Sequence, residues 1–250
     1  MSMEKVEAIQ FRGGRFSRIG DLVVKERVFR LFINGQFFCR IVASGEYLEE
    51  LGAGFVICEG LTERIVEIEV KDEEIHVEAA IRTGGVCGIG SAGGLELERE
   101  IPMVRGDAFV TPAEILRITR EIESELWQQT GGVHCAVLFR DGEPLVRRCD
   151  VGRHNTVDKV VGYAILRGID LSRCAIGCTG RQPAGMVAKA ARAGIPIVIS
   201  KAATTDRGIE TAEKAGITLI CFSRGDRFTC YSHPERVIGS PDPATLKAGQ

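Results

Sequence analysis

The alternation of apolar and polar residues predicts two regions with different architecture. In the N-terminal region, "LFINGQFFCRIV" (31–42) places Asn34-Gly35 between two apolar runs, which is typical of a tight β-hairpin. The next segment, "EYLEELGAGFVICEG" (46–60), repeats apolar residues at helical spacing. Residues 65–70 and 75–79 then alternate on either side of an acidic turn, which predicts a second hairpin whose apolar positions include Val66. This region is expected to form a small α+β domain, residues 1–106.

The pattern from residue 107 onwards predicts a larger α/β domain, residues 107–250. Thr111, Pro112 and Glu114 form a capping box that begins a helix expected to run to about residue 129. A hairpin follows around Asp141-Gly142, and helices then alternate with the strands "CAIGC", "IPIVIS" and "ITLICFS". Strands that alternate with helices predict right-handed crossovers, so we expect a mixed sheet in a three-layer α/β/α arrangement.

The topology of this domain predicts where a ligand binds. In open α/β sheets, ligands collect at the carboxyl ends of the parallel strands, which here are followed by "TGRQ" (179–182), "SKAATT" (200–205) and "FSRGDR" (222–227). Arg181, Arg224 and Arg227 are suited to phosphate recognition, and Ser200 offers a hydroxyl. These residues favour an anionic, phosphorylated ligand over a merely solvated set of loops.

A further group of polar residues lies at a junction between a strand and a helix. The segment "CDVGRHNTVDKVVG" (149–162) places Arg153 and His154 where they could donate to an anion, and Asn155 where it could cap the helix.

Charge and length limit the classes of function. The 250 residues are 44% hydrophobic and 26% charged, with a formal net charge of −2, which lacks the basic footprint of a nucleic-acid-binding protein. The first residues have no apolar core of signal-peptide type, and no run approaches transmembrane length. We therefore expect a cytoplasmic protein that binds neither nucleic acid nor membranes.

Cysteine is the residue type that carries the candidate chemistry. The nine cysteines include no C-x-x-C pair, and the four histidines show no ligand spacing, so a zinc site is not expected. Eight of the cysteines lie in or beside strands and helices and are interpreted as packing residues. The ninth, Cys87, lies in "RTGGVCGIGSAGG" (82–94), where six glycines leave a thiol free to react. It is the candidate nucleophile.

Four long motifs in order resemble the formate dehydrogenase accessory protein family, FdhD/NarQ. They are "TGGVHCA" (130–136), "DVGRHNTVDKVVG" (150–162), "TGRQPAGMVAKAARAGIPIVISKAATT" (179–205) and "ITLICFSRGDRFTCY" (217–231). The resemblance implies a cytidine-deaminase-like α/β/α domain behind a smaller N-terminal domain, assembled as a homodimer. It also implies a sulfurtransferase that takes sulfur from a cysteine desulfurase and passes it to the molybdenum cofactor in its molybdopterin guanine dinucleotide form. That cofactor is then inserted into formate dehydrogenase.

The resemblance also assigns roles to particular residues. Cys87 corresponds to the family's persulfide-carrying motif, C-G-V-C-G, but this chain has Gly84 at the first cysteine. The stretch from Phe222 through Ser223, Arg224, Gly225 and Asp226 to Arg227 matches the family's cofactor-binding segment and would hold the guanine-nucleotide end, so guanosine diphosphate is the expected stand-in.

The chain departs from the family at two more positions, with Cys149 and Gly185 where glutamate is usual. A zinc deaminase needs H-x-E together with P-C-x-x-C; the sequence has no C-x-x-C pair, so the ligand set is incomplete and that chemistry is not expected. Two hypotheses remain: a sulfur carrier that uses Cys87, and a non-catalytic chaperone of the molybdenum cofactor.

Overall fold

The protein combines a six-stranded mixed sheet, a four-stranded sheet and a projecting hairpin. The computed structural model describes residues 2–81 and 100–241. The six-stranded sheet has the order β12-β11-β10-β9-β7-β8. Its strands are β7 (His134–Arg140), β8 (Glu143–Asp150), β9 (Cys174–Cys178), β10 (Ile197–Ser200), β11 (Thr218–Arg224) and β12 (Arg227–Ser232). Strands β9, β10 and β11 are parallel to one another, as the alternation predicts, and β7 and β12 are antiparallel to their neighbours.

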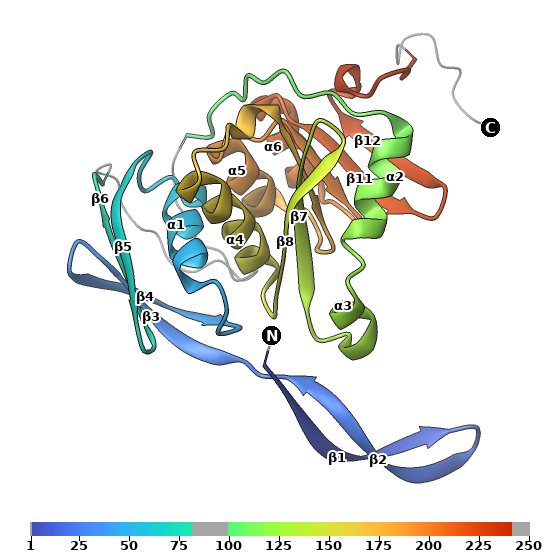
Figure 1. Ribbon diagram of the computed structural model, residues 1–250. Coiled ribbons are helices and arrows are strands. Elements are labelled where there is room, and N and C mark those ends of the chain that lie inside the picture. Colours follow the sequence, from blue (N-terminus) through green and yellow to red (C-terminus); the bar gives the residue numbers. More distant parts are fainter. Residues whose placement is uncertain (1, 82–99, 242–250) are drawn as a thin grey trace.

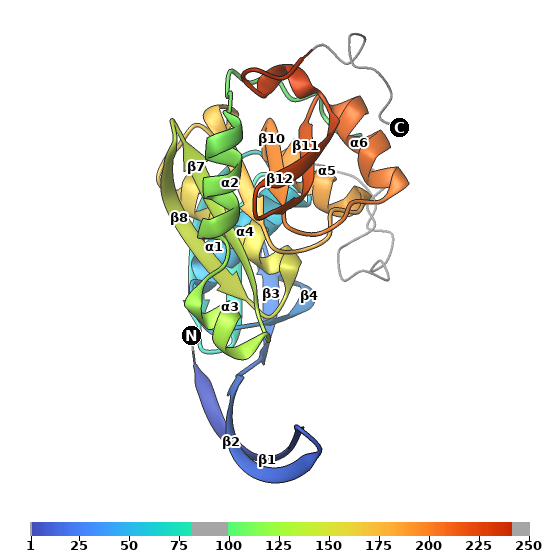
Figure 2. The same ribbon diagram turned by 90° about the vertical axis from the view of Figure 1, so that its right-hand side faces the viewer.

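Helices cover both faces of this sheet. One face carries α4 (Arg153–Leu166), α5 (Ala184–Arg192) and α6 (Asp206–Ala215), and the other carries α2 (Pro112–Glu121), followed by the short α3 (Glu125–Thr130). The two faces have separate apolar clusters, one that includes Val160 and Leu219 and one that includes Ile118 and Ile220. Figure 2 shows α2 on the side of the sheet opposite α5 and α6. The expected three-layer α/β/α arrangement with a mixed sheet is confirmed.

The four-stranded sheet is the smaller α+β unit. It consists of β3 (Arg27–Ile33), β4 (Gln36–Ala43), β5 (Ile65–Lys71) and β6 (Glu74–Ala79), in the order β4-β3-β6-β5. Helix α1 (Leu48–Cys58) lies between this sheet and α4 (Figure 1). One cluster of buried apolar side chains runs from Val77 through Leu51 and Val160 to Ile176. The regions 1–106 and 107–250 therefore share one apolar core.

Three local predictions need correction. The helix predicted from Thr111 to about residue 129 is two helices, because the Ser124 hydroxyl accepts the Trp127 N–H and begins α3. Val66 is 73% exposed, because a register shift between Ile65 and Glu67 turns it away from the core. Asn155 is not the N-cap of α4, which is Gly152.

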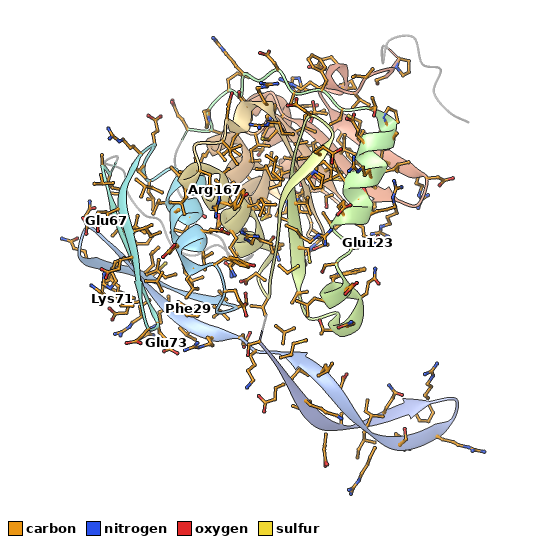
Figure 3. The ribbon with its side chains drawn as sticks, in the orientation of Figure 1. Phe29, Glu67, Lys71, Glu73, Glu123 and Arg167 are labelled. Carbon is orange, nitrogen blue, oxygen red and sulfur yellow. The ribbon has the colours of Figure 1, made fainter. Side chains whose placement is uncertain are left out.

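The N-terminal hairpin is an element that the sequence pattern did not reveal. Strands β1 (Met3–Arg12) and β2 (Arg15–Val24) pair along their whole length and project away from the body (Figures 1 and 2). Its side chains stand out from both faces (Figure 3), and the rings of Phe11 and Phe16 lie 5.0 Å apart near the tip. A strand pair that buries neither face needs no strict alternation of apolar and polar residues, which explains the missing signal.

Helices α1 and α4 cross with their backbones in close contact. A Cβ atom on Gly54 would lie 1.7 Å from the carbonyl oxygen of Asp158, and one on Gly162 would lie 1.8 Å from that of Glu50. Only glycine permits such an approach. This crossing joins the smaller unit to the helix that begins at the edge of the six-stranded sheet.

A buried carboxylate strengthens the same junction. Asp150, at the end of β8, accepts hydrogen bonds from the backbone N–H and hydroxyl of Ser44 at 3.0 and 2.9 Å and pairs with Lys159. Its second oxygen accepts from Gly152 N at 3.0 Å and Asn155 Nδ2 at 2.7 Å. Both Asp150 and Lys159 are fully buried. The carboxylate therefore fixes the first turn of α4 to the end of β8 and to the segment after β4.

We expect Gly54→Ala to lower the free energy of unfolding by about 3 kcal/mol or more, since its methyl group would overlap backbone atoms that cannot move aside. Urea denaturation measures the change. Gly185→Ala, in α5 with open space around the added Cβ, is the matched control and should cost nothing. Equal stability of the two variants would contradict the close crossing.

We expect Asp150→Asn to lower the free energy of unfolding by about 3–5 kcal/mol, because it leaves the Lys159 ammonium buried without its counter-charge. Asp141→Asn, in the exposed β7–β8 turn, is the control and should change stability by less than about 0.5 kcal/mol. Thermal and urea unfolding of both variants test this, and a loss at Asp150 no larger than at Asp141 would refute the role of the pair.

Candidate functional site

Four strands of the six-stranded sheet end at one edge, where three helices begin. Strands β8, β9, β10 and β11 run in the same direction, and α4, α5 and α6 start just after β8, β9 and β10. The free N–H groups at helix starts favour anions, and ligands of open α/β sheets bind at this edge. The edge therefore brings together the loops in which the sequence places its binding residues.

Hydrogen bonds connect these loops to one another. The Ser200 hydroxyl donates to the carbonyl of Gly180 at 2.8 Å and accepts from the N–H of Ala202 at 3.0 Å. The N–H of Phe222 in turn donates to the carbonyl of Ala202 at 3.0 Å. The Ser200 side chain is fully buried, so its hydroxyl holds the loops together and does not face solvent.

Positively charged side chains gather beside the first of these loops. The side chain of Arg153 packs against Gly180. A Cβ atom added to Gly180 would lie 2.8 Å from the Cβ and 3.0 Å from the Cδ of Arg153. Burial and the charge of nearby Arg181 both lower the pKa of Arg153. Because the charge of Arg181 destabilises the guanidinium of Arg153, an anion between the two would be favourable.

His134 extends this cluster from the neighbouring strand. Its Nδ1 lies 3.1 Å from the hydroxyl of Thr179, which also accepts the backbone N–H of Cys135 at 3.0 Å. Burial and the charge of Arg153 lower the pKa of His134, which keeps its imidazole neutral at pH 7. A neutral imidazole beside two guanidinium groups can donate or accept a hydrogen bond without adding charge.

His154 and Arg153 differ in their exposure to solvent. His154, in the first turn of α4, is 8% exposed, whereas Arg153 is half-buried and Arg181 is exposed. The two arginines are thus better placed than His154 to reach a ligand from solvent.

The segment Phe222–Arg227 forms the β11–β12 hairpin. Gly225 and Asp226 make its turn, and Arg227 begins β12 as an exposed residue. Phe222 has a φ of 51° and is 37% exposed, at a register shift in the ladder. The aromatic ring is therefore turned out of the sheet at the edge where the other loops lie.

Ser223 and Arg224 of this hairpin have structural partners. The fully buried Ser223 hydroxyl forms a hydrogen bond with Thr119 of α2, on the far face of the sheet. Arg224 donates its Nε to the carbonyl of Lys201 at 2.8 Å, and its guanidinium lies 5.8 Å from the Phe222 ring. These contacts link the hairpin to the β10 loop. Ser223 is the buried residue of the segment, whereas Phe222 and Arg224 to Arg227 are exposed to solvent.

Sequence reasoning missed two groups at this edge. His134 was not identified because its strand runs opposite to the others, so it contributes its first residue, rather than its last, to the edge. Lys201 pairs with Glu123, which Figure 3 labels between α2 and α3, and its ammonium lies 4.5 Å from the ring of Trp127. The signal for both was their position next to strand boundaries in the sequence.

Some predictions concern parts of the chain or ligands outside this description. Cys87 lies outside the described residues, as does the whole of "TGGVCGIGSAGG". Within residues 2–81 and 100–241, no three His, Cys, Asp or Glu side chains are grouped as metal ligands. In the same ranges, every helix is too short or too polar to span a bilayer.

Comparison with known proteins matches nearly the whole chain. The sequence model of the FdhD/NarQ family matches residues 24–238. The chain is 38% identical over 232 residues to the sulfur carrier protein FdhD of Methanothermobacter thermautotrophicus, covering 88% of this chain and 93% of that protein. It is 30% identical over 262 residues to the sulfur carrier protein FdhD of Bacillus subtilis, covering 94% and 98%.

A solved structure has the same fold. The crystal structure of a formate dehydrogenase accessory protein from Desulfotalea psychrophila superimposes with a TM-score of 0.81 at 30% identity, covering 94% of this chain and 99% of that one. The agreement extends over both the four-stranded and the six-stranded sheets, because the match spans almost every described residue. From the sequence match, the structural match and the shared motifs, we conclude that the chain belongs to the FdhD/NarQ family.

Proposed function

We propose that the protein is a sulfur carrier that supports the maturation of formate dehydrogenase. The observation that carries this proposal is the match, over nearly the whole chain, to relatives named sulfur carrier protein. The carrier would accept sulfur from a cysteine desulfurase as a persulfide on Cys87. It would then pass the sulfur to the molybdenum cofactor in its molybdopterin guanine dinucleotide form, before that cofactor enters formate dehydrogenase. We place this activity in the cytoplasm and in a homodimer.

The carboxyl edge of the six-stranded sheet is the proposed place for the nucleotide half of that cofactor. Arg181 lies close enough for its charge to lower the pKa of Arg153, and helices begin beside both residues. This chemistry suits a diphosphate, which carries several negative oxygens. Phe222 offers an exposed ring on which a base could stack, and Asp226 offers a carboxylate that could accept the hydrogen atoms of a guanine edge.

The proposed sulfur step needs a single thiolate. The thiolate of Cys87 attacks the outer sulfur of the donor's persulfide, the donor's S–S bond breaks, and the donor leaves as a thiolate. Cys87 then holds the sulfur as a persulfide that a second acceptor can attack. Gly84 stands where the family pattern has its first cysteine, so Cys87 would perform this step without a neighbouring thiol in the motif.

The second hypothesis, a chaperone that binds the cofactor without transferring sulfur, differs at Cys87. We expect Cys87→Ala to abolish the activation of formate dehydrogenase and to leave the melting temperature unchanged, because the proposal gives the thiol a role in sulfur transfer. Incubation with a cysteine desulfurase and cysteine, followed by mass spectrometry of alkylated peptides, should find a persulfide on Cys87. Cys39→Ala, which alters a partly buried thiol in β4, should behave as the unmodified chain. Full activation by Cys87→Ala would favour the chaperone.

The nucleotide site gives an independent test. Guanosine diphosphate at a hundredfold excess over its dissociation constant should stabilise the fold by about 2.7 kcal/mol, and adenosine diphosphate by less. Arg181→Ala should weaken binding at least about tenfold, because a hydrogen bond to a charged group contributes about 1.5–3 kcal/mol. Arg40→Ala, an exposed arginine of the four-stranded sheet, should leave binding unchanged. Calorimetry measures these affinities. Equal binding of the two nucleotides would contradict base recognition, and binding of neither would contradict the site.

A further inference from the structure

Two cysteines face each other across strands β7 and β8. Cys135 and Cys149 are direct partners in the antiparallel ladder, and both are free thiols. The N–H of Cys135 donates to the Thr179 hydroxyl, and its carbonyl accepts the Thr179 N–H, so both backbone groups point toward β9. Cys135 and Cys149 are therefore a non-hydrogen-bonded pair, the type in which opposite Cα atoms are about 4.5 Å apart. That separation is within the range that a disulfide can bridge.

A serine hydroxyl completes a three-membered polar cluster. The Oγ atom of Ser124, the N-cap of α3, lies 2.9 Å from Cys135 Sγ and 3.4 Å from Cys149 Sγ. Cys135 is fully buried beneath this group, whereas Cys149 is half-buried and open to solvent on one side. The cluster thus has one accessible sulfur and one sheltered sulfur.

The two thiols differ in acidity. A hydrogen bond from Cys135 lowers the pKa of Cys149 to about 7, with help from Ser124 and the charges of Arg147 and Lys159 against the opposing effect of burial. The same hydrogen bond, together with burial, raises the pKa of Cys135 well above its ordinary value. With its pKa near 7, Cys149 is thiolate in a substantial fraction of the molecules at neutral pH, while Cys135 stays a thiol.

This acidity sets Cys149 apart from the other described cysteines. Burial raises the pKa of each remaining one: Cys39, Cys58, Cys174, Cys178, Cys221 and Cys230. A raised pKa is expected of an inert packing thiol, whereas a lowered pKa is expected of a nucleophilic thiol. The interpretation of Cys149 as a packing residue is therefore too simple.

We propose that Cys149 is a second sulfur-accepting thiolate of this protein and that Cys135 is its resolving thiol. The proposal rests on the proposed sulfur-carrier function, which supplies persulfide sulfur, and it assigns to two residues in the sheet a reaction beyond the transfer at Cys87.

The reaction has two balanced steps. The Cys149 thiolate attacks the outer sulfur of a donor persulfide, R–S–SH; the donor's S–S bond breaks, R–S⁻ leaves with the bonding electrons, and Cys149 becomes Cys149–S–SH. Cys135 then attacks the inner sulfur, forming the Cys135–Cys149 disulfide. The outer sulfur leaves with the bonding electrons and takes the proton of Cys135, so it departs as hydrogen sulfide. Two thiols are oxidised by two electrons and one sulfane sulfur is reduced to sulfide; a dithiol reductant restores the pair.

The test uses the full chain carrying Cys87→Ala and inorganic polysulfide as the source of sulfane sulfur. This background chain should form the Cys135–Cys149 disulfide, seen by mass spectrometry as the loss of two hydrogen atoms, and release one sulfide per disulfide in addition to the shortened polysulfide or sulfide that the donor leaves behind. Adding Cys135→Ser should stop resolution and leave one extra sulfur atom on Cys149. Adding Cys149→Ser should prevent both products. Adding Cys230→Ser, which alters a partly buried thiol of β12, should change neither.

Sulfur on Cys135 instead of Cys149, or no sulfur on the chain with Cys135→Ser, would overturn the proposal. Melting curves identify a variant that does not fold, and alkylation of the unmodified chain then decides: at neutral pH, Cys149 should react before the six other described thiols outside its pair, and slower reaction would refute it. The assay uses no desulfurase, nucleotide or client enzyme. Its failure is therefore distinguishable from failure of the carrier function, which is measured by formate dehydrogenase activation.

Discussion

The carboxylate of Asp150 is the interaction on which the arrangement of this protein depends. It is fully buried, and it accepts hydrogen bonds from the segment after β4 and from the first turn of α4 while it pairs with Lys159. Burying a carboxylate and an ammonium is unfavourable unless every lone pair and proton finds a partner. Here the partners come from Ser44, just after β4, and from α4 and its N-cap, so the site edge and the smaller unit hold one another in place.

The close crossing of α1 and α4 extends this constraint along the helices. Since Gly54 and Gly162 allow backbone contact, α1 and α4 pack directly against each other. Charged side chains are buried beside this crossing. Lys189 of α5 pairs with Asp158 of α4 at 2.7 Å and with Glu59, just after α1, also at 2.7 Å. These buried pairs make the relative position of three helices specific. The start of α4, which carries Arg153, is consequently held rigidly beside Gly180.

The polar groups at the edge of the six-stranded sheet and the Cys135–Cys149 pair lie next to each other, on opposite faces of the sheet. The guanidinium groups of Arg153 and Arg181 and the neutral imidazole of His134 lie at the edge where α4 begins. The Cys135–Cys149 pair lies on the other face, beneath the cap of α3. His134 and Cys135 are consecutive residues and thus point to opposite faces of one strand. One short strand segment therefore contributes both to the proposed anion site and to the proposed thiol pair, with Thr179 bonded to both residues.

The sequence by itself determined the elements whose signals are local. The Asn34-Gly35 turn, the capping box at Thr111 and the alternation of strands and helices after residue 150 predict the observed hairpin, helix start and parallel strands, because turn and cap preferences act within a few residues. They also predict the edge at which the binding loops meet. Tertiary structure alone decided the roles of particular side chains. The burial of Ser200 and Ser223, the position of His134 and the pairing of Cys135 with Cys149 depend on strand direction and register, which bring together residues far apart in the chain. Asn155 illustrates the same limit: its type suits a helix cap, yet its amide donates to the nearby carboxylate of Asp150 and to the carbonyl of Val42, which is 113 residues away in the chain.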